Sequence, residues 1–237
     1  MIPKLPLALA ALLVFPISGS AQEEGKPSPV QVRAVLHDPA NPSADLFYTD
    51  EAGTVVKLEF RPHDLTEPLP MLPLNGSLVL YDKAEIDPGN PAASLAASAK
   101  LPAGTKRAMV VVMPGPADEK PPYRMLVIDD SQKAFPYGES RVLGLIGVET
   151  AIQAGEHRLP VHPGKITRVP PVRKVNDFNM AQTNFYFLQG DAWMPFTERQ
   201  LQYLDASRRL FIVHATPGAT APKVTTIVDT ARPGAAQ

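Results

Sequence analysis

The sequence predicts an all-β protein, and three observations support this prediction. Proline accounts for 27 of the 237 residues, about twice the average usage. Because proline lacks an amide donor and fixes φ, it disfavours helix interiors and central strands, so long helices are not expected. Short apolar runs that alternate with polar residues recur along the chain between turn residues. The hydrophobic fraction of 44% is too high for wholesale disorder and indicates a packed core.

The first half of the chain contains a series of predicted strands. In residues 30–36 apolar side chains alternate along the chain and fall on one face, as in a half-buried strand. Residues 45–49 and 54–60 read as a hairpin across the turn at 50–53. Residues 61–76 contain four prolines and are expected to form a long loop. Further strands are expected at residues 77–81, 94–101, 106–113 and 123–128.

The second half repeats this rhythm after a polar connector at residues 129–139. Four short strands, expected at residues 141–147, 149–153, 157–161 and 165–169, are typical of an antiparallel meander. A hairpin is predicted from residues 184–188 and 192–196, and a final strand pair at 210–215 and 223–229. Residues 197–209 fit either a helix that begins at a Thr197–Gln200 capping box or a strand. The surrounding strands favour the strand.

About twelve short strands without long helices predict a sandwich, because a single open sheet of that size curls or splits. We expect two tandem antiparallel β-sandwich domains of the immunoglobulin-like, seven-stranded type, at residues 28–130 and 138–229. One larger sandwich is the alternative. Residues 230–237 are expected to be a disordered tail. A similar turn phrase at 102–106 and 162–165 gives mild support for tandem domains.

The N-terminus predicts export from the cytoplasm. Lys4 precedes an apolar run at residues 5–15, and small residues follow at 18–21. This order is typical of a secretory signal peptide at residues 1–21, with cleavage between Ala21 and Gln22. The alternative is a retained anchor, but the run is shorter than the roughly 20 apolar residues that a spanning helix needs. We expect a periplasmic or extracellular protein with no stable membrane span after cleavage.

Charge and cysteine content exclude several functions. The formal net charge is −1, which gives no electrostatic reason to expect nucleic acid as a partner. The chain has no cysteine, so thiol catalysis, zinc–thiolate sites and disulfides are excluded. An exported chain without disulfides must derive its stability from sheet packing.

No catalytic residue, cofactor site or metal site is predicted. The segment 138–142 lacks the second glycine of a nucleophile elbow. His157 and His162 bracket one predicted strand and therefore lie roughly 17 Å apart, too far to share an ion. His63, in the long loop beside Asp64, is a candidate ligand-binding residue. His214 ends a predicted strand and is interpreted as a histidine at the sheet edge with its hydrogen bonds satisfied.

Two acidic segments are given structural interpretations. The carboxylates of residues 82–90 are a weak calcium candidate, and the turn at 87–90 is an ordinary β-turn. Asp129 and Asp130 are interpreted as the solvated start of a loop, because neighbours in a strand point to opposite faces and cannot form a paired-carboxylate site.

The aromatic residues of one predicted hairpin are the only candidate ligand surface. Phe185 and Phe187 share one face of their strand, and Tyr186 lies on the other. The phenylalanines and Trp193 are expected to fill the core. The alternative is an exposed platform that includes Tyr186 and Trp193, as in sandwiches that bind carbohydrate.

The strand at 141–145, the Pro-Gly turns and the phrase Leu101–Gly104 resemble exported bacterial β-sandwich proteins of unknown function. The resemblance implies an envelope or extracellular location and supplies no catalytic residues. The sequence therefore favours an exported, non-enzymatic envelope protein that serves as a binding, scaffold or assembly module for another protein. A carbohydrate-binding module is the alternative, with a glycan in place of the protein partner.

Overall fold

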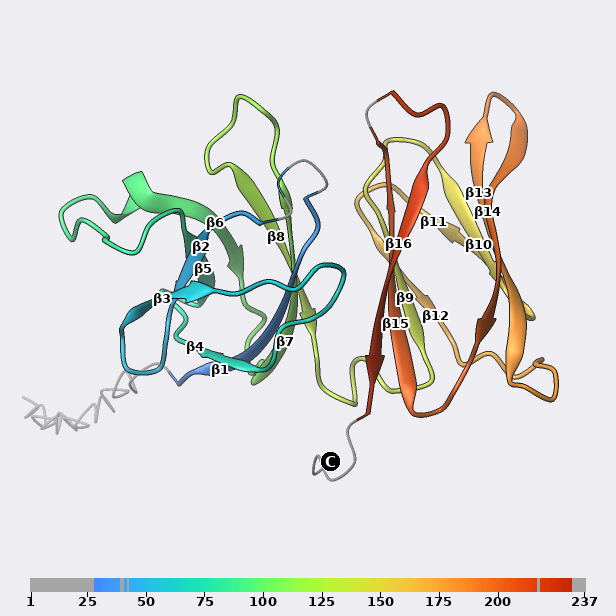
Figure 1. Cartoon of the computed structure of the whole chain (residues 1–237), viewed down its shortest axis with the longest axis horizontal. Coiled ribbons are helices and arrows are strands. Elements are labelled where there is room, and N and C mark those ends of the chain that lie inside the picture. Colours follow the sequence, from blue (N-terminus) through green and yellow to red (C-terminus); the bar gives the residue numbers. More distant parts are fainter. Residues whose placement is uncertain (1–27, 39–40, 42, 217, 232–237) are drawn as a thin grey trace, which may run out of the picture.

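The computed structural model describes residues 28–38, 41, 43–216 and 218–231, and within them the fold is all-β, as predicted (Figure 1). The strands of the first half are β1 (Val30–Leu36), β2 (Leu46–Thr49), β3 (Val55–Leu58), β4 (Leu69–Met71), β5 (Ser77–Tyr81), β6 (Leu95–Lys100), β7 (Arg107–Pro114) and β8 (Tyr123–Asp129). Those of the second half are β9 (Ser140–Gly144), β10 (Thr150–Ala154), β11 (His157–Val161), β12 (Ile166–Val169), β13 (Met180–Gln189), β14 (Ala192–Gln202), β15 (Ser207–His214) and β16 (Lys223–Thr230). One short 3₁₀ helix, η1 (Pro91–Ser94), precedes β6.

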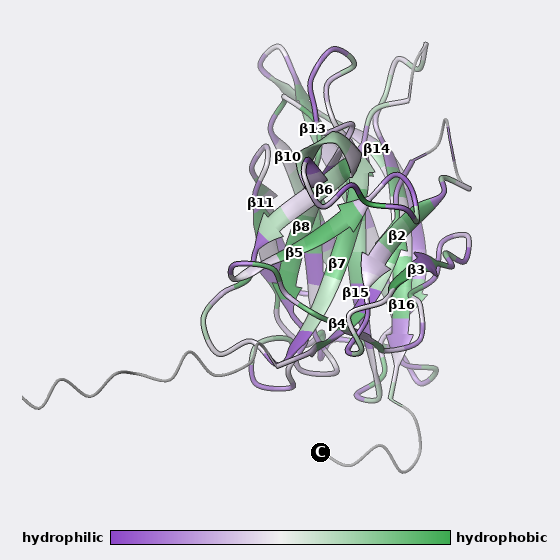
Figure 2. Cartoon of the chain, turned by 90° about the vertical axis from the view of Figure 1, so that its left-hand side faces the viewer, coloured by the Kyte–Doolittle hydropathy of each residue, from purple (hydrophilic) through white to green (hydrophobic). Residues whose placement is uncertain are grey.

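The strands of the first half form two four-stranded sheets that share a core. Their orders are β4-β1-β7-β8 and β3-β2-β5-β6. The alternation in β1 turns Val30, Val32 and Ala34 toward this core, where Leu46 and Leu80 from the opposite sheet are also buried. In Figure 2, β5 and β7 are hydrophobic over most of their length, while the loops are mostly hydrophilic. We call these eight strands the first unit.

The second unit, β9 to β16, has the same topology as the first. Its sheets have the orders β12-β9-β15-β16 and β11-β10-β13-β14, which are the first unit's orders with eight added to every strand number. In each unit the first strand pairs in parallel with the seventh and antiparallel with the fourth. Each unit therefore contains eight strands in the described chain, where the sequence indicated seven, and the sandwiches are not purely antiparallel.

The expected meander in the second half is wrong. Only β10 and β11 form a hairpin among its four strands, while β9 pairs with β12 and β15. A meander and this arrangement have the same alternation and turn spacing, because local sequence does not specify which strand becomes the neighbour. The phrase at 102–106 also marks no repeat, since it precedes the seventh strand of its unit whereas residues 162–165 precede the fourth.

Two predictions about strand positions have clear outcomes. Residues 197–202 continue β14, so the strand alternative was correct and the helix was not. The predicted loop at 61–76 contains the three-residue strand β4, which pairs with Val30–Val32 of β1. Pro70 lies in this strand, and proline is tolerated there because β4 is an edge strand.

A third apolar core joins the two units. The sheets that contain β1 and β9 pack face to face, so the four sheets form a stack (Figure 1). The buried side chains of this core are Val35, Leu65, Met109, Val111 and Ile128 from the first unit, Leu143, Leu210, Ile212 and Ile227 from the second, and Phe135 from the connector. Each fully buried side chain of this kind stabilises the packed state by about 1.5–3 kcal/mol. The units therefore form one continuous body.

A buried network of four charges lies beside this core. Arg33 of β1 donates two hydrogen bonds to Asp130 at 2.9 Å each, and two to Asp229 of β16 at 2.7 and 2.6 Å. Arg208 of β15 donates to Asp229 at 2.7 Å and also bonds Asp130 and the Phe135 carbonyl. Burial alone raises the pKa of Asp229, but the bonds and charges of the two arginines outweigh this and lower the pKa below its usual value.

The network corrects the interpretation of Asp129 and Asp130. Asp129 is exposed, as expected, but Asp130 is only 3% exposed and holds two arginines from different units. The two residues do point to opposite faces. Asp130 is buried because the second unit packs against it. This contact is between distant segments, so the local sequence pattern does not predict it.

Several predictions concern residues outside the described ranges. The signal peptide at 1–21 and its cleavage site at Ala21 and Gln22 lie there, as does the tail beyond Ala231. Thr230, which the sequence assigned to the tail, is the last residue of β16. Among the described residues, no helix has the length and apolar character needed to cross a membrane.

Candidate functional site

Tyr186 and Trp193 lie on the outer face of the sheet β11-β10-β13-β14, which faces away from the first unit (Figure 1). In the β13–β14 hairpin, Tyr186 pairs with Pro195 and Trp193 pairs with Leu188. Directly paired residues share a face of the sheet, so both rings are on the outer side. Trp193 is 41% exposed, which contradicts the expectation that it fills the core.

The phenylalanines of the hairpin are packed inward. Phe185 is 2% exposed, and its ring lies 5.3 Å from that of Phe211 and 6.1 Å from that of Phe196. Phe187 is half-buried and contacts Phe196 edge-on at 5.9 Å. The predicted division of the hairpin into two faces is therefore confirmed for the phenylalanines.

Polar side chains surround Tyr186 on the outer face. The Tyr186 hydroxyl donates to Gln153 Oε1 at 3.3 Å and accepts from Asn184 Nδ2 at 3.3 Å. Gln182 donates to the Asn184 side chain at 2.6 Å, and the guanidinium carbon of Arg158 lies 5.9 Å from the centre of the Tyr186 ring. Tyr186 is therefore half-buried and already engaged, and Trp193 is the freer ring.

Exposed apolar side chains lie on both faces of the sheet near the β13–β14 turn. Met194 follows Trp193 in β14 and is 42% exposed, but it pairs with Phe187 and therefore points to the opposite face from Trp193. Val148, which is 43% exposed, lies in the loop before β10, next to Glu149, whose carbonyl accepts from the Leu188 amide. We call Val148, Trp193 and Met194 the hairpin patch. Single exposed apolar residues are common, but an exposed tryptophan on an edge strand, with further exposed apolar side chains at the same end of the sheet, is typical of binding surfaces.

A second candidate is a pocket of about 450 Å³ between the units. Its walls come from the end of β1, the loop after β3, and strands β15 and β16. The polar residues that line it are His37, Asp38, Arg61, His63, His214, Thr216, Lys223 and Thr225. The sequence analysis named His63 and His214 separately, but nothing in it related them to each other or to His37. Only the packing of the two units brings them together.

Two histidines of this pocket, His37 and His214, have lowered pKa values that favour their uncharged form. Burial, with additional contributions from the nearby His214 and His63, lowers the pKa of His37 to about 4. Burial also lowers the pKa of His214, with Lys223 adding to the effect. The His37 and His214 rings meet edge to face, with centres 4.5 Å apart. Within the described residues, however, no group of three or more His, Asp or Glu has the geometry of a metal site.

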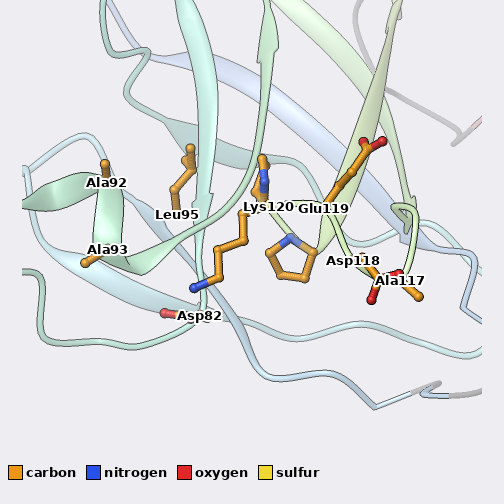
Figure 3. A pocket seen from close by; sticks show the side chains of 10 residues that line it. Asp82, Ala92, Ala93, Leu95, Ala117, Asp118, Glu119 and Lys120 are labelled. Atoms are coloured by element: carbon orange, nitrogen blue, oxygen red, sulfur yellow. The ribbon is translucent and has the colours of Figure 1, made fainter.

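An open groove of about 490 Å³ in the first unit is the third hollow of note. Figure 3 shows Lys120 reaching across it toward Asp82, with Asp118 and Glu119 on the loop between β7 and β8. Glu119 pairs with Arg124 at 3.1 Å, and both side chains are more than 60% exposed. Exposed charges of this kind do not preorganise a ligand site, so the groove carries no functional assignment.

The remaining residues considered from sequence have structural partners. His157 bonds the Pro171 carbonyl at 3.1 Å, and His162 pairs with Glu149 at 2.9 Å. The two histidines therefore have separate partners and do not share a site. Glu139 lies in the segment 138–142, whose sequence partly resembles a nucleophile elbow, and it is buried and pairs with Arg168. Asp87 caps its turn by accepting from the Gly89 amide at 2.8 Å.

Comparison with known proteins assigns none of these sites. No family model matches the chain, and no curated protein matches it either. The function must therefore be argued from the geometry of the surfaces described above.

Proposed function

We propose that the protein is an exported, non-enzymatic binding module whose partner is another protein, bound at the β13–β14 hairpin. The observation that carries this proposal is the hairpin patch. Aromatic residues and methionine are enriched in the cores of protein interfaces, and charged residues surround such cores. Here Trp193 and Met194 are both exposed, on opposite faces of the edge strand β14, and the charged Arg158 is on β11 of the same sheet.

The open edge of β14 supports a mode of binding. β14 is eleven residues long and pairs only with β13 within the described chain. The other side of an edge strand has unpaired backbone groups, which can accept an extended segment of a partner. Pro195 and the register shift at Phe185–Tyr186 interrupt regular pairing. These features disfavour uncontrolled edge-to-edge association of identical copies.

A photo-crosslinking experiment tests this proposal. A photoreactive phenylalanine analogue replaces Trp193 in the native host, and a matched analogue replaces Val228, another exposed apolar residue, on β16. The protein crosslinked only from position 193 is identified, purified and titrated with the wild-type protein. We expect Trp193→Ala to weaken this binding at least tenfold, about 1.4 kcal/mol, while changing stability by less than about 0.5 kcal/mol.

The control variant for this experiment is Val228→Ala, which should leave the affinity unchanged. Equal crosslinking from positions 193 and 228, or equal affinity of Trp193→Ala and wild type, contradicts the proposed surface.

Glycan binding is the second candidate, and one observation favours it. Tyr186 and Trp193 share a face with the amides of Gln153, Gln182 and Asn184, and rings combined with amides suit sugar recognition. The Arg158 guanidinium over Tyr186 argues against a free stacking platform. Binding on a glycan array that is lost in both Tyr186→Ala and Trp193→Ala supports this candidate in preference to a protein partner.

The location and the finer fold class are part of the same proposal. Export follows from the signal peptide predicted at residues 1–21, and N-terminal sequencing of the mature protein should begin at Gln22. We propose that both sandwiches belong to the immunoglobulin-like class, because each unit packs two sheets around its own core, although the eighth strand and the parallel pairing of the first and seventh strands depart from the seven-stranded antiparallel form. The resemblance to exported bacterial β-sandwich proteins is consistent with this location.

A further inference from the structure

The pocket between the two units is a built site that the hairpin patch does not involve. We propose that it binds a small organic monocarboxylate: a compact apolar body that carries one negative charge. The pocket volume of about 450 Å³ falls in the range of small-molecule sites. Sites of this size commonly form where two domains meet, as this one does.

The apolar part of the ligand is specified by the pocket walls. Val35, Ile212 and Ile227 line the pocket and also belong to the core between the units. Pro62 and Val224 also line the pocket and add to this apolar surface. A ligand body in contact with these side chains buries apolar area that is otherwise in contact with water.

The charge of the ligand is specified by the permanent charges around the pocket. Lys223 and Arg61 supply two positive charges, and the Asp38 carboxylate supplies one negative charge. Asp38 already accepts from the Asn41 amide at 3.0 Å, and Arg61 lies 3.8 Å from Glu67 in an exposed pair. Because both arms of that pair are about half-exposed or more, Arg61 can turn to a new partner at little cost.

His37 supplies a directional group inside the pocket. It is 8% exposed, and within the described chain neither of its ring nitrogens makes a hydrogen bond. An uncharged imidazole has one N–H donor, which can bond a carboxylate oxygen. His214 beside it is already committed, with one nitrogen 3.1 Å from the Thr225 hydroxyl and the other 3.2 Å from the Ala215 carbonyl. Of the two facing imidazoles, His37 is therefore the one available to a ligand in the pocket.

Fluorine NMR titration with a matched pair of probes tests the proposal. The probes are 4-(trifluoromethyl)benzoate and 4-(trifluoromethyl)benzyl alcohol, which share a body and differ in charge. We expect the benzoate to bind at millimolar concentration or better, and the alcohol to bind at least about tenfold more weakly, because hydrogen bonds to charged groups are the stronger ones.

Two lysine variants locate the charge that the benzoate recognises. Lys223→Gln should weaken benzoate binding at least about fivefold and leave alcohol binding unchanged. Lys165→Gln is the control, because Lys165 is an exposed lysine in the turn before β12, outside the pocket. Both changes are at exposed positions, so both variants are expected to fold.

Three results overturn the proposal: no benzoate binding at millimolar concentration, equal binding of the two probes, or equal effects of Lys223→Gln and Lys165→Gln. Trp193→Ala should leave benzoate binding unchanged, since Trp193 lies on the opposite face of the second unit. This variant separates the present proposal from the proposed protein-binding function, so either can fail without the other.

Discussion

The two units have the same topology but differ in the length of one hairpin. In the first unit, β5 and β6 contain five and six residues, whereas their counterparts β13 and β14 contain ten and eleven. The added length carries Trp193 and Met194, the exposed side chains proposed to bind a partner. The comparison teaches that the two units share one strand framework, and that the surface proposed to bind a partner lies where the units diverge.

A second comparison concerns the arginines at equivalent positions. The strand registers place Arg33 beside Met109 and Arg141 beside Leu210, so these arginines correspond. By the same registers Arg208 corresponds to Arg107. Only one arginine of each corresponding pair belongs to the buried network, although both corresponding aspartates, Asp130 and Asp229, belong to it. The two units therefore contribute equivalent strands to the interface, but their corresponding arginines differ in whether they join the buried network.

The strongest test of this asymmetry compares Arg208→Met with Arg107→Met. Arg208 is 1% exposed and bonds both aspartates, so its removal leaves uncompensated buried charge and should destabilise the protein by about 3–5 kcal/mol. Arg107 is exposed, and its variant should stay within about 0.5 kcal/mol of wild type. Denaturant unfolding measures both, and similar losses for the two variants contradict the asymmetry.

The corresponding pair Arg33 and Arg141 should show a smaller difference. Arg33→Met removes four hydrogen bonds from the aspartates and should cost about 2–3 kcal/mol. The buried Nε of Arg141 has no partner within the described residues, and its terminal nitrogen bonds only the Ala134 carbonyl. Replacing it with methionine should therefore cost less than about 1 kcal/mol. Thermal unfolding of the two variants side by side is the measurement, and a larger loss for Arg141→Met refutes the comparison.

The smallest expected effect is a pH dependence at the opposite end of the interface. Because the pKa of His37 is lowered to about 4 in the folded state, the unfolded chain binds more protons below its ordinary value of 6.5. Stability should be full above about pH 6.5 and fall by about 2 kcal/mol as the pH drops toward 4. His37 faces His214, His63 and Asp38, and His214 adds a change of the same sign.

Chemical denaturation at a series of pH values measures this dependence, with His37→Phe as the comparison. The variant should lose most of the decrease between pH 6.5 and 4 and retain the part due to His214. Asp229, whose pKa is lowered from 3.8, affects stability only at more acidic pH. An unchanged pH profile in His37→Phe assigns the dependence to other groups.

The strands of this protein were predictable from sequence, because their signal is local. Alternation and turn residues predicted β1, the β2–β3 hairpin and the strand character of residues 197–202. β4 was missed because three residues that include Pro70 give no alternation to detect. The partner of each strand was less predictable, as the failed meander shows, since pairing is decided by contacts between distant segments.

The candidate sites were predictable only where one hairpin contains them. Tyr186 and Trp193 are seven residues apart and were identified, although the exposure of Trp193 was not expected. The pocket combines His37 and Arg61 of the first unit with Lys223 of the second, and it forms only when the units pack. Asp130 was expected to be solvated for the same reason, since its burial also depends on the packing of the two units.

The pairing of Arg33 with Asp229 has a consequence for biogenesis. These residues are 196 positions apart, and Asp229 lies in β16, the last strand of the described residues. In each unit the first strand also lacks its parallel neighbour until the seventh strand has been made. Because a chain is synthesised from its N-terminus, β1 and Arg33 cannot reach these partners until the distant strands that carry them have been made. The interface between the units therefore forms as a late folding event.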